Sequence, residues 1–229
     1  MPATIDIKHE ILTYTGTFEP PVLELWGNGN AIMRGFYQAF TPHNVTLRDF
    51  QIQTHTPNAS ESFITITVGS AIVKFSFGSI EVTFTSLGEA ELLGIPGFLD
   101  ASTSWLKKEV PDFKFGSHSI LYHQHSFLNG TTVQRLLATV NASKLELPGV
   151  DLGSGAIFNR SVPERFWTTQ IILDKSVPFP GALFLGMSIK VGTGVVEYQK
   201  LFAEGMSFYA ETLKALDLES PYLAGTGKS

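Results

Sequence analysis

Period-two alternation of apolar and polar residues dominates the middle of the chain. In one run, Val73, Phe75 and Phe77 fall on one side, and Lys74 and Ser76 fall on the other. Strands of this kind, joined by short turns, pair antiparallel and cover one face. The pattern therefore predicts an antiparallel meander from four runs: residues 45–55, 62–68, 71–77 and 79–86.

Strand patterns also occur on both sides of this meander. Each is rich in β-branched and aromatic residues, which favour extended backbone. A turn containing Pro178 and Pro180 separates the last two. We expect four further strands, at residues 4–18, 113–128, 165–174 and 181–191.

Helical periodicity appears first at residues 27–40. Ile32, Phe36 and Phe40 recur at i, i+4 and i+8, which places them on one helix face. Asn28 or Asn30 could cap the start of this helix. The spacing predicts an amphipathic helix that ends at the Thr41–Pro42 step, because a residue before proline avoids helical backbone.

Three more helices follow from the same periodicity. Pro96–Gly97 is expected to break the segment that starts at Glu89, so the second helix covers about residues 99–110. Thr131 or Thr132 can cap a short third helix. We expect the last two helices at residues 133–140 and at about 195–218.

The order of elements indicates the fold class. Strands and helices do not alternate as they do in parallel βαβ units, so we expect an α+β fold. In it, amphipathic helices, including a long C-terminal helix, pack on an antiparallel meander sheet. We interpret residues 1–220 as a single α+β domain, in which 1–110 and 111–220 could form two similar halves, and 221–229 as a flexible tail.

Composition narrows the classes of function. Apolar residues make up 43% of the 229, enough for a large core, and charged residues only 16%, against a typical value of about 25%. The net charge is −5, and Lys107–Lys108 is the one basic cluster that we find. Binding the phosphate backbone requires many cations on one face, so we expect no nucleic-acid partner.

The chain contains no cysteine, which excludes disulfides, thiolate nucleophiles and cysteine-ligated metals. Residues 1–10 lack the basic start and apolar run of a signal peptide. No apolar run reaches the roughly 18 residues that a membrane-spanning helix requires. We therefore expect no membrane span, and the cytoplasm is the default location.

The stretch ILYHQHSF, residues 120–127, carries the candidate chemistry. On a β-strand, His123 and His125 point to the same side and could share a metal ion. A mononuclear site requires one or two more ligands, and His9, Glu10 and His55 are candidates. Alternatively, the two imidazoles are ordinary amphipathic rings on a half-exposed face, which is the interpretation that we favour.

Two glycine-rich stretches resemble phosphate-binding motifs but lack required parts. GTGKS at residues 225–229 has Tyr222 where a phosphate loop requires glycine, and no helix follows it. GNGN at residues 27–30 lacks the third glycine of a dinucleotide-binding fingerprint. We expect no cofactor.

Large aromatic side chains outnumber reactive groups, and they suggest the leading hypothesis. It is a soluble, non-enzymatic module that binds a hydrophobic small molecule or a protein partner in an aromatic-rich interior between sheet and helices. The candidate ligand-binding residues are Arg34, Phe36, Tyr37, Phe75, Phe77, Phe202 and Tyr209.

Two alternatives remain open at this point. The first is a metal-dependent enzyme that uses His123 and His125. The second is a subunit of a larger assembly, in which the aromatic residues would form an interface.

Overall fold

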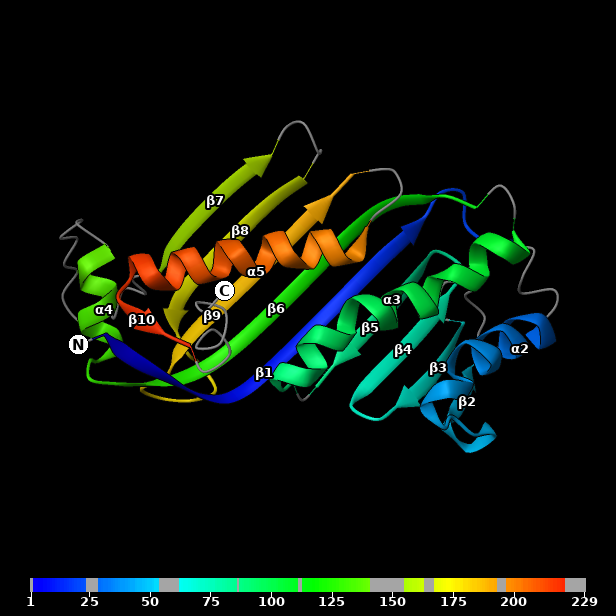
Figure 1. Cartoon of the computed structure of the whole chain (residues 1–229), viewed down its shortest axis with the longest axis horizontal. Coiled ribbons are helices and arrows are strands. Elements are labelled where there is room, and N and C mark those ends of the chain that lie inside the picture. Colours follow the sequence, from blue (N-terminus) through cyan, green and yellow to red (C-terminus); the bar gives the residue numbers. More distant parts are fainter. Residues whose placement is uncertain are drawn as a thin grey trace, which may run out of the picture. The chain divides into compact units, whose positions relative to one another are not determined.

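A computed structural model (Figure 1) gives the three-dimensional structure of the chain. It describes residues 2–23, 29–53, 62–85, 87–110, 113–140, 155–162, 167–192 and 197–220. Several predictions lie outside these residues: the Asn28 cap, His55, the 225–229 motif and the 221–229 tail.

Ten strands are described: β1 (Ala3–Phe18), β2 (Phe50–Gln53), β3 (Phe63–Val68), β4 (Ala71–Ser76), β5 (Ser79–Phe84), β6 (Phe115–Asn129), β7 (Ala156–Val162), β8 (Trp167–Lys175), β9 (Leu183–Val191) and β10 (Leu218–Glu219). The helices are α2 (Gly29–Phe40), α3 (Glu89–Glu109), α4 (Val133–Val140) and α5 (Tyr198–Ala215), with 3₁₀ turns η1 (Thr41–His43) and η2 (Leu47–Asp49). This content confirms the predicted α+β class with an antiparallel sheet and a long C-terminal helix.

The chain forms two compact units. The first unit consists of residues 1–11, 121–189 and 203–229, and the second of residues 12–120 and 190–202. In the first unit the strand order is β1-β6-β9-β8-β7, and β10 pairs parallel with β1. In the second unit the order is β2-β3-β4-β5-β1-β6, and the neighbours from β2 to β1 pair antiparallel. The interpretation of residues 1–220 as a single domain, with possible halves 1–110 and 111–220, stays a prediction.

Aromatic rings form the core of the second unit. The ring of Phe36 on α2 contacts Phe75 on β4, at 5.5 Å between ring centroids, and Trp105 on α3, at 4.7 Å. Phe98 on α3 contacts Phe84 on β5, at 5.4 Å. Helices α2 and α3 therefore cover one face of the β3–β5 meander, which is visible in Figure 1.

A buried polar cluster accompanies these rings. The Tyr14 hydroxyl hydrogen-bonds to His118 Nδ1 (2.9 Å) and to the Tyr198 hydroxyl (2.7 Å). Tyr14 is 0% and His118 2% exposed, so each depends on this cluster for polar partners that water cannot supply. Burial raises the pKa of Tyr14 far above its ordinary value, and the neighbouring Tyr198 raises it further.

In the first unit, the part of α5 from Ala203 onward lies over the sheet (Figure 1). Gly205 allows this close approach, because a Cβ added there would lie 2.3 Å from Ile189 Cδ1 on β9. Within the described residues, no helix is long and apolar enough to cross a membrane.

The predicted helix break at Pro96–Gly97 is wrong. Helix α3 runs through Pro96 as one element, and the flanking Ile95 and Leu99 are fully buried. Proline removes one backbone donor, and burial of these side chains outweighs that loss.

The structure also differs from the sequence prediction at two strands. The sequence interpretation assigned no strand to Ala156–Val162, which forms β7 at the edge of the sheet. In the predicted strand at 45–55, only Phe50–Gln53 is extended among the described residues, and Leu47–Asp49 forms a 3₁₀ turn. Thr46 initiates that turn, because the Asp49 carboxylate accepts hydrogen bonds from the Thr46 amide (2.7 Å) and hydroxyl (2.9 Å).

Gly35→Ala should destabilise the second unit although alanine favours helices. The added Cβ would lie 2.6 Å from Trp105 Cε3, and the indole cannot shift because Phe36 and Phe75 pack against it. We expect urea unfolding to show a loss of about 1–3 kcal/mol. Gly94→Ala in α3 is the control: nothing lies within 4 Å of its Cβ, so a gain of roughly 0.5–1 kcal/mol is expected. A stabilising Gly35→Ala would contradict the packing described.

Tyr14→Phe should leave His118 Nδ1 and the Tyr198 hydroxyl without their shared partner in a buried environment. The expected loss of unfolding free energy is about 1–3 kcal/mol, measured by chemical denaturation. Tyr37→Phe serves as the control, because Tyr37 is 41% exposed and should change stability by less than about 0.5 kcal/mol. Equal effects at both positions would refute a structural role for the cluster.

Candidate functional site

The two faces of β6 have opposite character in the first unit. Tyr122, Gln124 and Ser126 are buried beneath α5, whereas His123 is exposed and His125 partly exposed on the other side. Period-two alternation places these sets on opposite faces. His118 belongs to the buried face, as its spacing from His123 predicts.

The buried face carries a chain of hydrogen bonds. The Tyr122 hydroxyl donates to Glu10 Oε2 (2.8 Å), and the Tyr209 hydroxyl of α5 donates to Gln124 Oε1 (2.6 Å). Gln124 Nε2 donates to Ser126 Oγ (2.6 Å). Glu10 is only 6% exposed, and a buried carboxylate requires such donors to offset its lost hydration. This chain ties α5 to β6 and β1.

A change of phase in β1 separates Glu10 from His9. Ala3 and Ile5 are buried at odd positions, but from Glu10 onward the even positions are buried. Lys8 and His9 are therefore both exposed, next to each other. Since a shift of one residue exchanges the two faces of a strand, Glu10 turns towards α5 and His9 towards the uncovered side.

His9 joins the two histidines of β6 on that uncovered side. We define the histidine face as His9, His123, His125, Phe179 and Phe184. The His125 ring lies 6.0 Å from His9, 5.4 Å from Phe179 and 5.2 Å from Phe184 between centroids, and His123 lies 5.4 Å from Phe184. Burial lowers the pKa of His125, and the imidazoles of His9 and His123 lower that pKa further. His125 is therefore neutral at pH 7.

Ser176 completes the arrangement at the start of the β8–β9 connection. Its Oγ lies 2.9 Å from His125 Nδ1 and accepts a hydrogen bond from the Phe179 amide (3.1 Å). The histidine tautomer decides which atom of this pair donates: when the imidazole proton lies on Nε2, the Ser176 hydroxyl donates to Nδ1. Ser176 is 7% exposed. A hydroxyl that donates to a neutral imidazole is the arrangement that activates a serine nucleophile.

Ser176 also lines a cavity of about 510 Å³. One wall is the beginning of α4, from Thr131 to Gln134, and the other is the β8–β9 connection, with Lys175 and Gly181. Thr132 fixes the first wall, because its Oγ1 caps α4 by accepting from the Arg135 amide (3.2 Å). The cavity is large enough for a small ligand beside Ser176.

A metal centre at His123 and His125 stays a prediction. The structure adds His9 to their face but buries Glu10 on the opposite one. Among the described residues, no group of three or more His, Asp or Glu is placed to hold a metal ion.

The seven residues predicted to bind a ligand do not gather at one place. Phe36, Phe75 and Tyr209 are 0% exposed, whereas Tyr37 is 41% exposed and Arg34 is exposed. None of the seven lines the cavity at Ser176. The rings of Phe36 and Phe75 pack against Trp105 in the core, and the assignment of the seven residues stays a prediction.

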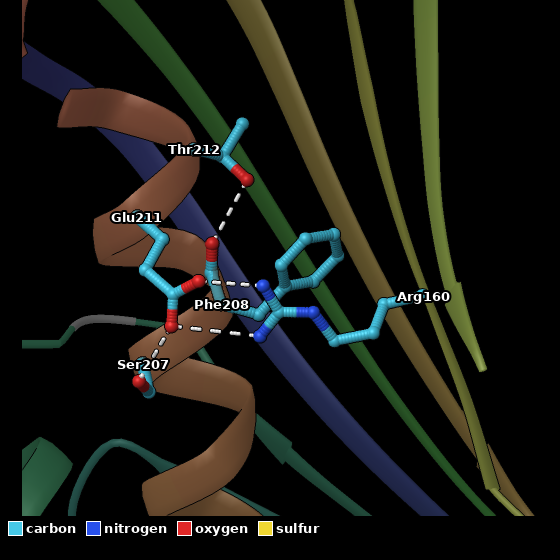
Figure 2. Close-up of polar contacts among 5 residues, drawn as sticks. All are labelled: Arg160, Ser207, Phe208, Glu211 and Thr212. Carbon is cyan, nitrogen blue, oxygen red and sulfur yellow. Dashed lines mark hydrogen bonds and ion pairs between the residues drawn. The ribbon is translucent and has the colours of Figure 1, made fainter. Parts of the chain in front are cut away.

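Arg160, which the sequence interpretation did not single out, fastens α5 to β7 (Figure 2). Its Nη2 pairs with Glu211 Oε2 (2.5 Å), and its guanidinium lies 4.2 Å from the centre of the Phe208 ring. The hydrogen bond from Arg160 lowers the pKa of Glu211, with a smaller effect from Ser207. Both side chains are about half exposed, so the ion pair is a surface contact between α5 and β7.

Ser176 was missed because no sequence motif marks it. It lies in SVPFPG, residues 176–181, which indicates only a proline-containing turn. His125 lies 51 positions away, and sequence spacing gives no sign that they meet.

Comparison with known proteins gives no family for this chain. No family model and no curated protein matches it. One solved structure, the rolling circle replication initiator protein from Geobacillus stearothermophilus, is similar over 92% of this chain and 84% of that chain, with a TM-score of 0.32 and 10% sequence identity.

This comparison contradicts two expectations, a non-enzymatic binding module and the exclusion of nucleic acid, because the protein it finds is a replication initiator. Both are withdrawn. A likeness with a TM-score of 0.32 and 10% identity gives this chain no activity, substrate or partner of its own.

Proposed function

We propose that the chain is a serine hydrolase-like enzyme that catalyses acyl transfer, with Ser176 as nucleophile and His125 as general base. The observation that carries the proposal is the 2.9 Å contact between Ser176 Oγ and His125 Nδ1 beside a cavity. A nucleophile hydrogen-bonded to a base is the signature of covalent catalysis by serine.

The protonation states suit this role. A base must be unprotonated at the working pH, and the lowered pKa of His125 keeps it so. With Nδ1 as the acceptor, the imidazole proton resides on Nε2. The Phe179 amide holds Ser176 Oγ in place, and in this tautomer the serine hydroxyl donates to Nδ1.

The reaction has two steps in this arrangement. Ser176 Oγ attacks the carbonyl carbon of an ester or amide, and its proton moves to His125 Nδ1. The imidazolium returns that proton to the leaving group, and the acyl group stays on Oγ. Water then gives a proton to His125 and attacks the acyl carbon. The bond from that carbon to Oγ breaks, the imidazolium returns the proton to Ser176 Oγ, and the acid leaves.

The cavity defines where a substrate would lie. Phe127, Leu128 and Val133 offer an apolar wall for the acyl chain, and Thr131 and Gln134 offer polar contacts. The cytoplasm, expected from the sequence as the default compartment, stays the proposed location of this reaction.

A competing role for Ser176 is purely structural. Its Oγ accepts the amide of Phe179 three residues ahead, which is a common way to stabilise a turn. Such a serine would be hydrogen-bonded but unreactive, so chemical reactivity separates the two roles.

A fluorophosphonate reagent tests the proposal, because it forms a phosphorus–oxygen bond with activated serines and releases fluoride. We expect one adduct by intact mass spectrometry, located at Ser176 by peptide mapping, and none in Ser176→Ala. His125→Gln should label about 100-fold or more slowly. The matched control, Ser161→Ala, removes an exposed serine of β7 and should label normally.

Thermal melting of each variant must first show that it is folded. A folded wild-type protein that gains no adduct, or labelling at Ser176 that persists unchanged in His125→Gln, would refute the assignment.

A further inference from the structure

We propose that His9 is a positioning residue that holds the His125 imidazole in line with Ser176. This inference rests on the proposed function, and it concerns how the base is oriented rather than whether the reaction occurs.

The orientation of His125 requires support from neighbours. The second side-chain torsion of histidine has broad energy minima, so one hydrogen bond to Ser176 restrains the ring weakly. A productive proton transfer requires Nδ1 to stay within hydrogen-bonding distance of Oγ. Side chains that pack against the ring must supply the remaining restraint.

Three rings supply that packing from three parts of the first unit. His9 comes from β1, Phe179 from the β8–β9 connection and Phe184 from β9. The His9 and His125 planes are stacked at 26°, whereas Phe179 and Phe184 are tilted by 51° and 43°. The nearly parallel stack restrains the ring plane of His125 in a way that the tilted contacts do not.

His9 also contacts the residue that holds the nucleophile. Its ring lies 6.2 Å from that of Phe179, whose amide donates to Ser176 Oγ. His9 therefore lies beside both the base and the turn that carries the serine.

The phase change in β1 supports this assignment. Had the alternation of Ala3 and Ile5 continued, residue 9 would face α5 and not the histidine face. Because of the shift, His9 reaches His125 while Glu10 is directed into the buried hydrogen bonds.

Two variants and one control test the role of His9. His9→Ala removes the stacked ring, His9→Phe keeps a ring without its nitrogens, and His123→Ala removes an imidazole that contacts Phe184. The ¹⁵N chemical shifts of His125 report its tautomer and hydrogen bonding without any reaction. Fluorophosphonate labelling at increasing reagent concentrations separates the rate of bond formation from reagent binding.

His9→Ala should average the ¹⁵N shifts of His125 between tautomers and slow bond formation roughly 10- to 100-fold, with reagent binding unchanged. His9→Phe should return the His125 ¹⁵N shifts and the rate of bond formation to those of the wild type. His123→Ala should leave the tautomer of His125 unchanged. If the His125 shifts in a folded His9→Ala protein equal those of the wild type, the positioning role is refuted. If His9→Ala changes the His125 shifts but the wild type forms no adduct, the positioning role stands and the hydrolase assignment fails.

Discussion

Alternation along β6 is the constraint on which the rest of the first unit depends. A strand sends successive side chains to opposite faces, so one segment must supply both the buried contacts to α5 and the exposed histidine face. Tyr122 and Gln124 meet Glu10 and Tyr209 on one side, while His125 meets Ser176 on the other. A shift of β6 by one residue would bury the imidazoles and expose the glutamine, so the two faces fix one register.

The polar contacts under α5 make that register strict. An apolar interface tolerates sliding, but Glu10 and Gln124 lose their partners if the helix or the strand moves. The cost of burying these groups is offset only in one arrangement. Two further contacts hold α5 in place. Gly205 lets the helix approach β9 closely, and the exposed Arg160–Glu211 pair joins the helix to β7. The histidine face consequently rests on a sheet whose covered side is firmly specified.

The β8–β9 connection links this scaffold to the chemistry. Ser176 both accepts the Phe179 amide and contacts His125, so turn formation and placement of the hydroxyl are one event. Phe179, fixed by that turn, packs on the His125 ring. The turn therefore places both the Ser176 hydroxyl and the Phe179 ring against the His125 imidazole.

The sequence by itself determined the elements and their faces, because period-two and 3.6-residue patterns are local properties of neighbouring residues. The α+β class, the meander, α5 and the shared face of His123 and His125 follow from those patterns. Local patterns misjudged Pro96, where burial of Ile95 and Leu99 keeps α3 continuous, and β7, which requires pairing with β8. Only the tertiary structure decided which groups meet: Ser176 with His125, Glu10 with Tyr122, and the aromatic residues with one another as core. The physical reason is that these contacts join residues far apart in the chain, and their distances depend on strand order and register, which residue spacing does not encode.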